Sequence, residues 1–315
     1  ALSSQGWTHS PSSLLFAGNG RQAIAAAFSA LAPLGGRVGF EELTYPVAKA
    51  IATRLGMEAI PIPCDDDGLR PDGLEQAHRD SRLHAVYLQP TLQNPLGMTM
   101  SAQRRSELAT VLTRLNGPVV VEDRVYAFLE EAAPPPLAAF AHDHVVVVDS
   151  LSKIVAPGLT LGFVCAPEHL ITPLANALIV GAWAPQRFSF EIGVRWLCDG
   201  SAEALKAAKR LDALKRQSIA RTALKGLDIR ANPTAYHLLL ALPPHWRAEA
   251  YALAAERRGI AITPGAAFAV ASGFAPNLVR LALAPPALDD LSVALGTLSA
   301  LARSKTESDF VRWSG

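Results

Sequence analysis

Four groups of polar residues stand where apolar runs of this 315-residue chain end. They are an amine, a carboxylate, an amide and a glycine-rich turn: Lys153 after residues 144–150, Asp123 at the end of 118–123, Asn94 after 85–90, and GNGRQ at 18–22. In an open parallel sheet the ligand crevice lies outside the carboxyl ends of the strands. We therefore expect the four groups to converge on one crevice.

Each group suits one part of a charged aromatic phosphate. The helix that GNGRQ opens would present backbone N–H groups and a positive dipole to a phosphate. The amine of Lys153 is a nucleophile that forms a Schiff base with a carbonyl carbon. A carboxylate such as Asp123, placed opposite a pyridine nitrogen, keeps that nitrogen protonated and makes the ring an electron sink. Together these requirements describe pyridoxal 5′-phosphate.

The elements that must position these groups alternate between β-rich and helix-like stretches. Several apolar runs lack polar alternation, as expected for strands covered on both faces, so we predict an α/β fold with a mostly parallel sheet between helices. The expected strands are residues 14–18, 36–42, 58–63, 85–90, 118–123, 144–150 and 161–167. Helical periodicity marks residues 21–32, 46–56 and 101–115, the last with Ser101 as its N-cap.

A long helical region is predicted from about residue 187 to 225, followed by a smaller C-terminal α+β unit. We expect strands in YHLLLALP, IAITPG and NLVRLALA, and helices in AEAYALAAERRG and ALDDLSVALGTLSALARS. The predicted division is a cofactor-binding large domain at 13–187, an interdomain helical region at 188–225, a small domain at 226–305 and a polar tail at 306–315.

Composition excludes several other classes of protein. The 29 basic and 28 acidic residues give a net charge of +1, and no basic run marks a nucleic-acid surface on this chain. Cys64, Cys165 and Cys198 have neither metal-ligand nor disulfide-framework spacing, so we expect buried thiols, no metal and a reducing cytoplasm. No apolar stretch approaches the roughly 18 residues that a membrane span needs.

Four segments resemble, in order, the signatures of fold-type-I, aspartate-aminotransferase-like enzymes that depend on pyridoxal phosphate: PTLQNPLG, VEDRVYAF, DSLSKIVAPGLTLGFV and NLVRLALA. The resemblance extends over nearly all of residues 13–303. Residues 41–77 and 262–270 are most similar to the aminotransferase-like domain of MocR-type transcription regulators of the GntR superfamily, in which a winged helix-turn-helix precedes this domain. Because the chain begins ALSSQGW, without Met or such a segment, we expect it to be a fragment of a longer protein.

The resemblance implies the roles of five residues around the cofactor ring. Lys153 would form the Schiff base and later move protons, while Asp123 would pair with the ring nitrogen. Asn94 and Tyr126 would hold the ring hydroxyl. Tyr45 would lie against the ring face, where stacking contributes about 0.5–1.5 kcal/mol beyond burial.

Four further residues are implied at the charged ends of the site. Gly20, Arg21 and Ser150 would contact the phosphate, and Arg280 would bind a substrate carboxylate through a bidentate pair. In PGLTLG, Thr160 stands where the family has an arginine that grips the phosphate. Losing one charge-assisted contact costs about 1.5–3 kcal/mol. Either Arg21 supplies the missing charge, which is our hypothesis, or phosphate binding has decayed.

Each candidate also has a plainer explanation. In the plainer explanation, Lys153 is a solvated loop residue, Asp123 is the N-cap of a helix and Asn94 is part of an ordinary turn. Arg280 would then lie on the surface of an edge strand, and Tyr45 would serve packing alone.

Three functions remain open at this point. The favoured one is the effector domain of a MocR-type regulator that senses pyridoxal phosphate, or an amino compound reacting with it, and contacts DNA only through a winged-helix domain. The second is an aminotransferase acting on an amino acid and a 2-oxo acid, and the third a dimerisation module with a vestigial site. The resemblance further implies a homodimer with its sites at the subunit interface.

Overall fold

The computed structural model describes residues 6–158, 161–271, 273 and 276–304, so Thr160 and the tail predicted at 306–315 lie outside the described residues. Within them a seven-stranded sheet has the order β1-β9-β8-β7-β6-β2-β3. Its strands are β1 Leu14–Ala17, β2 Arg37–Glu41, β3 Glu58–Ile62, β6 Ala85–Leu88, β7 Val119–Asp123, β8 Val145–Ser150 and β9 Gly162–Cys165. Each of the seven strands predicted between residues 14 and 167 is therefore present, with ends within two residues of the expected ones.

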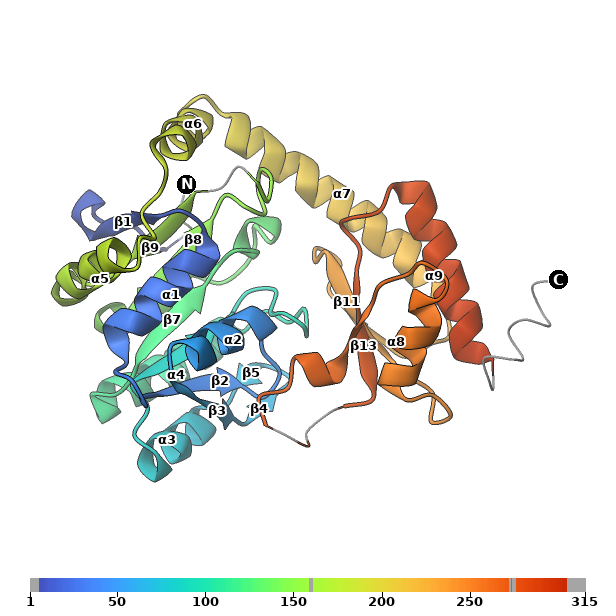
Figure 1. Ribbon diagram of the computed structural model, residues 1–315, viewed down its shortest axis with the longest axis horizontal. Coiled ribbons are helices and arrows are strands. Elements are labelled where there is room, and N and C mark those ends of the chain that lie inside the picture. Colours follow the sequence, from blue (N-terminus) through green and yellow to red (C-terminus); the bar gives the residue numbers. More distant parts are fainter. Residues whose placement is uncertain (1–5, 159–160, 272, 274–275, 305–315) are drawn as a thin grey trace.

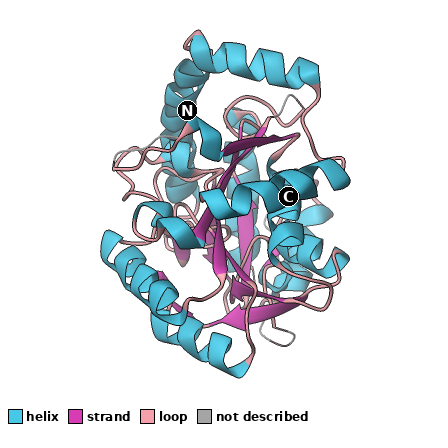
Figure 2. Cartoon of the chain, turned by 90° about the vertical axis from the view of Figure 1, so that its left-hand side faces the viewer, coloured by secondary structure: helices cyan, strands magenta, loops and turns pink. Residues whose placement is uncertain are grey.

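The central sheet is mostly parallel, as predicted. Neighbouring strands from β3 to β8 pair in parallel, whereas β9 runs antiparallel to both β8 and β1. Successive residues of one strand enter different cores: Val120 of β7 packs in one hydrophobic cluster and Val121 in the other. This double coverage explains why the strands are apolar throughout. Figure 2 shows the strands enclosed by helices.

Two groups of helices cover the two faces of this sheet. On one face lie α1 Gly20–Leu31, α2 Pro46–Arg54 and α5 Glu168–Val180. On the other lie α3 Pro71–Asp80 and α4 Ala102–Leu115. Polar caps set the starts of two helices, since the side chain of Asn19 accepts from the Gln22 backbone N–H before α1 and that of Ser101 accepts from Arg104 before α4, as predicted.

The C-terminal unit is built on an antiparallel sheet of order β10-β11-β13-β12. Its strands are β10 Ile229–Ala231, β11 His237–Ala241, β12 Thr263–Pro264 and β13 Leu278–Ala282. Helices α8 Ala248–Glu256 and α9 Leu288–Arg303 form a separate hydrophobic core with this sheet. A large α/β unit with a smaller α+β unit is the fold class expected from the sequence; the residue boundaries of the two units stay a prediction.

Two helices connect the units, α6 Arg187–Cys198 and α7 Ser201–Ala223. The single helical region predicted over 187–225 is therefore interrupted, at Gly200, whose φ of 85° is a left-handed conformation that glycine adopts without strain. In Figure 1, α7 runs from α6, beside the central sheet, to α9 of the small unit.

The remaining elements are short. A two-stranded ladder joins β4 Cys64–Asp65 to β5 Gly68–Leu69. Single turns of 3-10 helix occupy Pro11–Ser13, Ala127–Leu129, Leu137–Ala139, His142–His144 and Gly265–Ala267.

The cysteines differ in exposure. Cys165 is buried and Cys64 half-buried, but Cys198 is exposed at the end of α6. The expectation of buried thiols is therefore wrong for Cys198.

Among the described residues, no helix combines the length and the apolar character that crossing a membrane requires.

Candidate active site

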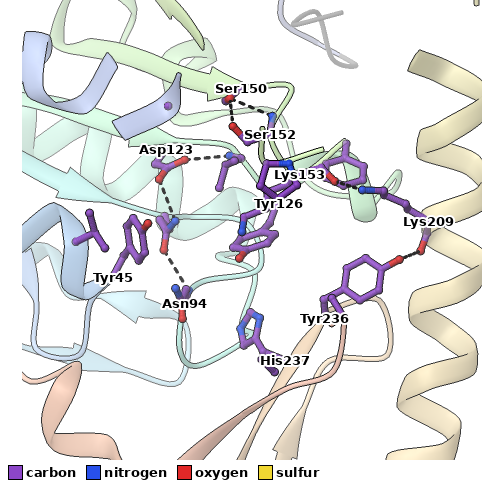
Figure 3. Close-up of a pocket in the computed structure, with 18 of the residues that line it drawn as sticks. Tyr45, Asn94, Asp123, Tyr126, Ser150, Ser152, Lys153, Lys209, Tyr236 and His237 are labelled. Atoms are coloured by element: carbon purple, nitrogen blue, oxygen red, sulfur yellow. Dashed lines mark hydrogen bonds between the residues drawn. The ribbon is translucent and has the colours of Figure 1, made fainter. Parts of the chain in front are cut away.

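One pocket collects the predicted residues at the carboxyl ends of the parallel strands. Its volume is about 1080 Å³, and it lies between the central sheet, the small sheet and α7. It is lined by all nine predicted site residues: Gly20, Arg21, Tyr45, Asn94, Asp123, Tyr126, Ser150, Lys153 and Arg280. Figure 3 shows the ring of polar side chains around it.

Asp123 ends β7 and is buried at the base of the pocket, with both carboxyl oxygens hydrogen-bonded. Its Oδ2 accepts from the Tyr87 hydroxyl at 2.6 Å and from Gln89 Nε2 at 3.1 Å. Its Oδ1 accepts from the Val125 backbone N–H at 3.0 Å. Burial raises the pKa of Asp123, whereas these donors and the positive charge of Lys153 lower it. The pKa of Asp123 is raised overall, so the donors reduce but do not cancel the preference of a buried carboxyl for its neutral form.

Two of these partners, Tyr87 and Gln89, were not predicted from the sequence. Tyr87 lies inside β6 and Gln89 directly after it, on the strand next to β7. Val86 and Leu88 pack in one core while Tyr87 packs in the other. The available signal was a hydroxyl in an otherwise apolar strand, because a buried hydroxyl needs a hydrogen-bond partner.

Another wall of the pocket is formed by the N-terminus of α1 and the end of β8. A Cβ atom at Gly20 would lie 3.2 Å from Ser150 Cβ, and one at Gly162 would lie 2.5 Å from the Asn19 carbonyl oxygen. Both glycines thus allow α1 to approach the sheet closely. Ser152 also lines the pocket and was missed; its Oγ is 2.7 Å from Ser150 Oγ. Two hydroxyls therefore lie beside a helix N-terminus.

Arg21 and Tyr45 stand next to each other at the rim. Arg21 is exposed, and its positive charge lowers the pKa of Tyr45, which burial raises. Tyr45 itself directly precedes α2 and is half-buried. The exposed guanidinium is thus placed near the α1 N-terminus, beside Tyr45.

Lys153 lies in the turn that follows β8, and its side chain points into the pocket above Tyr126. Its Nζ is 5.7 Å from the centroid of the Tyr126 ring. On the other side of the turn, Lys209 Nζ donates to the Lys153 carbonyl oxygen at 2.6 Å. Lys153 is therefore an exposed residue that lines the pocket and whose backbone is tethered to α7.

Arg280 enters the pocket from the small sheet. Its strand, β13, lies between β11 and β12, so it is not an edge strand. Nη1 of Arg280 donates to Asn94 Oδ1 at 3.0 Å, and its guanidinium lies 5.3 Å from the Phe268 ring centroid. Its Nε is buried without a hydrogen-bond partner. This unpaired donor makes Arg280 a candidate for binding an anionic group that the chain itself does not provide.

Asn94 and His237 line the pocket where the central sheet meets the small sheet. Asn94 is buried, follows β6 and forms a cis peptide bond with Pro95. His237 also lines the pocket, and its Nε2 is 3.1 Å from the Gln93 carbonyl oxygen. Burial and the charge of Arg280 lower the pKa of His237 to about 4. The ring is therefore neutral near pH 7 and carries its proton on Nε2, because a carbonyl oxygen only accepts.

Known proteins give a context for this geometry. HTH-type transcriptional regulator YdeF of Bacillus subtilis (strain 168) is 29% identical over 297 residues, which cover 94% of this chain and 64% of the regulator. Vitamin B6 salvage pathway transcriptional repressor PtsJ of Salmonella typhimurium is 29% identical over 218 residues, which cover 69% of this chain and 50% of the repressor. The chain thus spans only about half to two thirds of these relatives.

A solved archaeal alanine:glyoxylate aminotransferase has the same fold, with a TM-score of 0.85 and 23% identity over 95% of this chain and 76% of that chain. The family described as aminotransferase class I and II matches residues 2–298. Since that match extends over most of the sequence, the chain belongs to the class I and II aminotransferase family.

Proposed function

We propose that this chain is the effector domain of a MocR-type transcription regulator and that its pocket binds pyridoxal 5′-phosphate, the cofactor that its family implies. The observation that carries the proposal is the convergence of a tethered lysine, a buried carboxylate and a helix N-terminus on one pocket. Relatives named as HTH-type regulator and as vitamin B6 salvage repressor support the regulatory part. Both are longer than the matched segment, which leaves room in them for a DNA-binding domain.

The pocket residues fit this cofactor. When bound, pyridoxal phosphate supplies an aldehyde that reacts with amines and a ring that withdraws electrons. Lys153 would hold the aldehyde carbon, and Asp123, as a carboxylate, would accept a hydrogen bond from the protonated ring nitrogen. Asn94 and Tyr126 would hold the ring hydroxyl, with Tyr45 against the ring face. The donors around Asp123 support its role, since an acceptor for a cationic N–H must stay ionised.

The α1 N-terminus supports a phosphate at the other end. Gly20, Ser150 and Ser152 line that wall, where backbone N–H groups and the helix dipole favour an anion. Arg21 would add the positive charge that Thr160 lacks. Replacing Arg21 by Ala should weaken pyridoxal phosphate binding about tenfold and leave binding of unphosphorylated pyridoxal unchanged. Equal weakening for both ligands, or none for either, would contradict the role of Arg21.

Arg280 marks the ligand end of the pocket. Its single described side-chain hydrogen bond goes to Asn94, and its buried Nε lacks a partner. A carboxylate would accept from Nε and Nη2 together, in the bidentate geometry that guanidinium favours. The effector is therefore an amino compound with a carboxylate, such as an amino acid. DNA binding would come from a separate winged-helix domain, and the functional unit would be a homodimer.

Absorbance spectroscopy tests the cofactor part of the proposal. Pyridoxal phosphate added to the purified protein should develop the band of a cofactor bonded to a lysine amine, and borohydride should make that bond permanent. Lys153→Ala should lose both effects. Lys215→Ala, which removes an exposed lysine of α7, should keep them. A permanent label on another residue of the wild type, located by mass spectrometry, would refute Lys153 as the attachment site.

Transamination is the second candidate, favoured by membership of an aminotransferase family and by Lys153 lying above Tyr126 and facing Asp123. The released Lys153 amine would take a proton from the Cα atom of the amino acid. Adding an amino acid to the loaded protein separates the two candidates. Stoichiometric conversion to pyridoxamine phosphate and a 2-oxo acid, measured by chromatography, indicates the enzyme, whereas a spectral change without conversion indicates the sensor.

A further inference from the structure

Helix α7 holds the backbone of the segment that carries Lys153. Lys209 Nζ donates to the Lys153 carbonyl oxygen at 2.6 Å and to the Val155 carbonyl oxygen at 3.4 Å. The amine thus contacts the middle and the last residue of the turn that the Val155 N–H closes by donating to the Leu151 carbonyl at 2.8 Å. Lys209 is half-buried and lines the same pocket.

The next residue of α7 holds a second segment of the site. Arg210 Nε donates to the Phe128 carbonyl oxygen at 2.6 Å, two residues after Tyr126. Its Nη1 also pairs with Glu131. Two consecutive cations of one helix therefore bind the backbones that present Lys153 and Tyr126.

Two turns further along, α7 binds the small sheet in the same way. Gln217 Nε2 donates to the Ala235 and His237 carbonyl oxygens at 2.7 and 3.0 Å. Arg216 Nη1 donates to the Leu283 and Pro286 carbonyls, both at 2.7 Å, just after the strand that carries Arg280. One helix thus contacts the segments that bear the amine and the carboxylate-binding group.

Tyr236, from the small unit, hydrogen-bonds to the part of α7 that contains Lys209. Its hydroxyl lies 2.8 Å from both the Lys209 carbonyl oxygen and Asp212 Oδ2, and Asp212 accepts from Arg216 Nε at 2.8 Å. Figure 3 shows Lys209 and Tyr236 on the α7 side of the pocket, facing Lys153. The small unit is therefore hydrogen-bonded to the same turn of α7 that holds the Lys153 backbone.

We propose that Lys209 is a positioning residue for Lys153, and that through it α7 couples the attachment site of the cofactor to the small unit and Arg280. The inference rests on the proposed function, because Lys153 needs positioning only if it bonds the cofactor. Lys209 acts through the backbone of Lys153. A change at Lys153 reaches the small sheet by way of Lys209, Tyr236 and Arg216.

Electrostatics provide a second link between the two amines. Burial lowers the pKa of Lys209, and the positive charge of Lys153 lowers it further, whereas Asp212 raises it. Lys153 in turn faces Asp123 from the central sheet and Tyr126 beneath it. Removing the charge of Lys209 therefore removes a repulsion between the two amines, whereas an arginine at this position keeps it.

Hydrogen exchange of the cofactor-free protein tests the positioning role without any ligand. Lys209→Met should speed amide exchange in residues 151–158 about tenfold, because two carbonyl contacts are lost. Lys209→Arg, which keeps a charged donor, should restore slow exchange. Lys215→Met removes an exposed lysine of the same helix and should match the wild type. Unchanged exchange in Lys209→Met, with a wild-type melting temperature, would overturn the proposal.

The pH dependence of cofactor absorbance tests the coupling of the two amines. In Lys209→Met the pH midpoint of the absorbance change should rise by roughly 0.5–1 unit, while Lys209→Arg and Lys215→Met should keep the wild-type midpoint. A purely structural role would leave the midpoint in place, and that result would overturn the coupling. If the wild type binds no cofactor at Lys153, the proposed function fails, and the exchange experiment still decides whether Lys209 holds the turn.

Discussion

Glu41 and Asp123 end two parallel strands of the same sheet, and both carboxyls are buried, but their surroundings differ. Asp123 has hydrogen-bond donors on both oxygens and lines the pocket. Glu41 accepts through Oε2 only, from Gln93 Nε2 at 3.2 Å and from the Gln89 N–H at 3.5 Å, while its Oε1 has no partner. Asp123 therefore has donors on both carboxyl oxygens, whereas Glu41 has donors on only one.

The difference distinguishes a carboxyl suited to ligand binding from a structural one, although both lie at the same edge of the sheet. Burial raises the pKa of both carboxyls, to about 8 for Glu41, but three donors oppose this at Asp123. Glu41 is therefore largely protonated near pH 7, and Asp123 is the one suited to pair with a cationic ring nitrogen. Gln89 touches both groups, giving its side-chain amide to Asp123 and its backbone N–H to Glu41.

The largest expected effect on ligand binding comes from replacing each carboxyl by the corresponding amide. Asp123→Asn should weaken pyridoxal phosphate binding about ten- to hundredfold, because a charge-assisted hydrogen bond to the ring nitrogen is lost. Glu41→Gln, a matched change outside the pocket, should leave the dissociation constant nearly unchanged. Absorbance titration at pH 7.5 measures both constants. A similar loss in the two variants would show that the donors around Asp123 do not distinguish it from Glu41.

The second effect is on folding stability and its pH dependence. Because the pKa of Glu41 is raised in the folded protein, its contribution to stability is complete below the ordinary value of 4.5 and is lost as the pH rises through about 8. The wild type should therefore lose roughly 2 kcal/mol between pH 6 and pH 8 at this group. Glu41→Gln should lack this loss. Urea unfolding at several pH values measures the free energy of unfolding of both proteins. If this free energy changes with pH in the same way in the wild type and in Glu41→Gln, the prediction that Glu41 is neutral is contradicted.

The comparison also shows what local sequence reveals about a site. Lys153, Asp123 and Asn94 were predicted because each follows an apolar run, and such ends meet at one edge of a parallel sheet. Tyr87 and Gln89 escaped prediction because their partner, Asp123, comes from the neighbouring strand. Their contact depends on which face Tyr87 presents, and an apolar strand covered on both sides gives no alternation from which to infer it.

The same limit applies to helices and to the small unit. Helix α5 was not predicted, since it contains Pro173 and its apolar run shows no distinct polar face. His237 and Lys209 reach the pocket only because the two units fold against each other through α7, a relation between distant segments that has no local pattern. The large sheet, by contrast, followed from apolar runs that can be recognised within each segment.

The smallest effect concerns a single donor to Asp123 and gives the finest test of the comparison. The Tyr87 hydroxyl donates to the carboxylate at 2.6 Å, and such a donor lowers the pKa of the acid. Tyr87→Phe should therefore raise the pKa of Asp123, so cofactor affinity should fall about three- to tenfold at pH 6 and less at pH 8.

Tyr251→Phe is the matched control, because that buried hydroxyl donates to the Leu298 carbonyl in the core of the small unit, at 2.7 Å. It should leave the dependence of cofactor affinity on pH unchanged, as measured by absorbance titration between pH 5.5 and pH 8.5. If the Tyr87→Phe and Tyr251→Phe curves coincide, the hydroxyl of Tyr87 does not tune Asp123. Gln89 and the Val125 N–H would then be the donors that matter, and Asp123 would differ from Glu41 only in having donors on both oxygens.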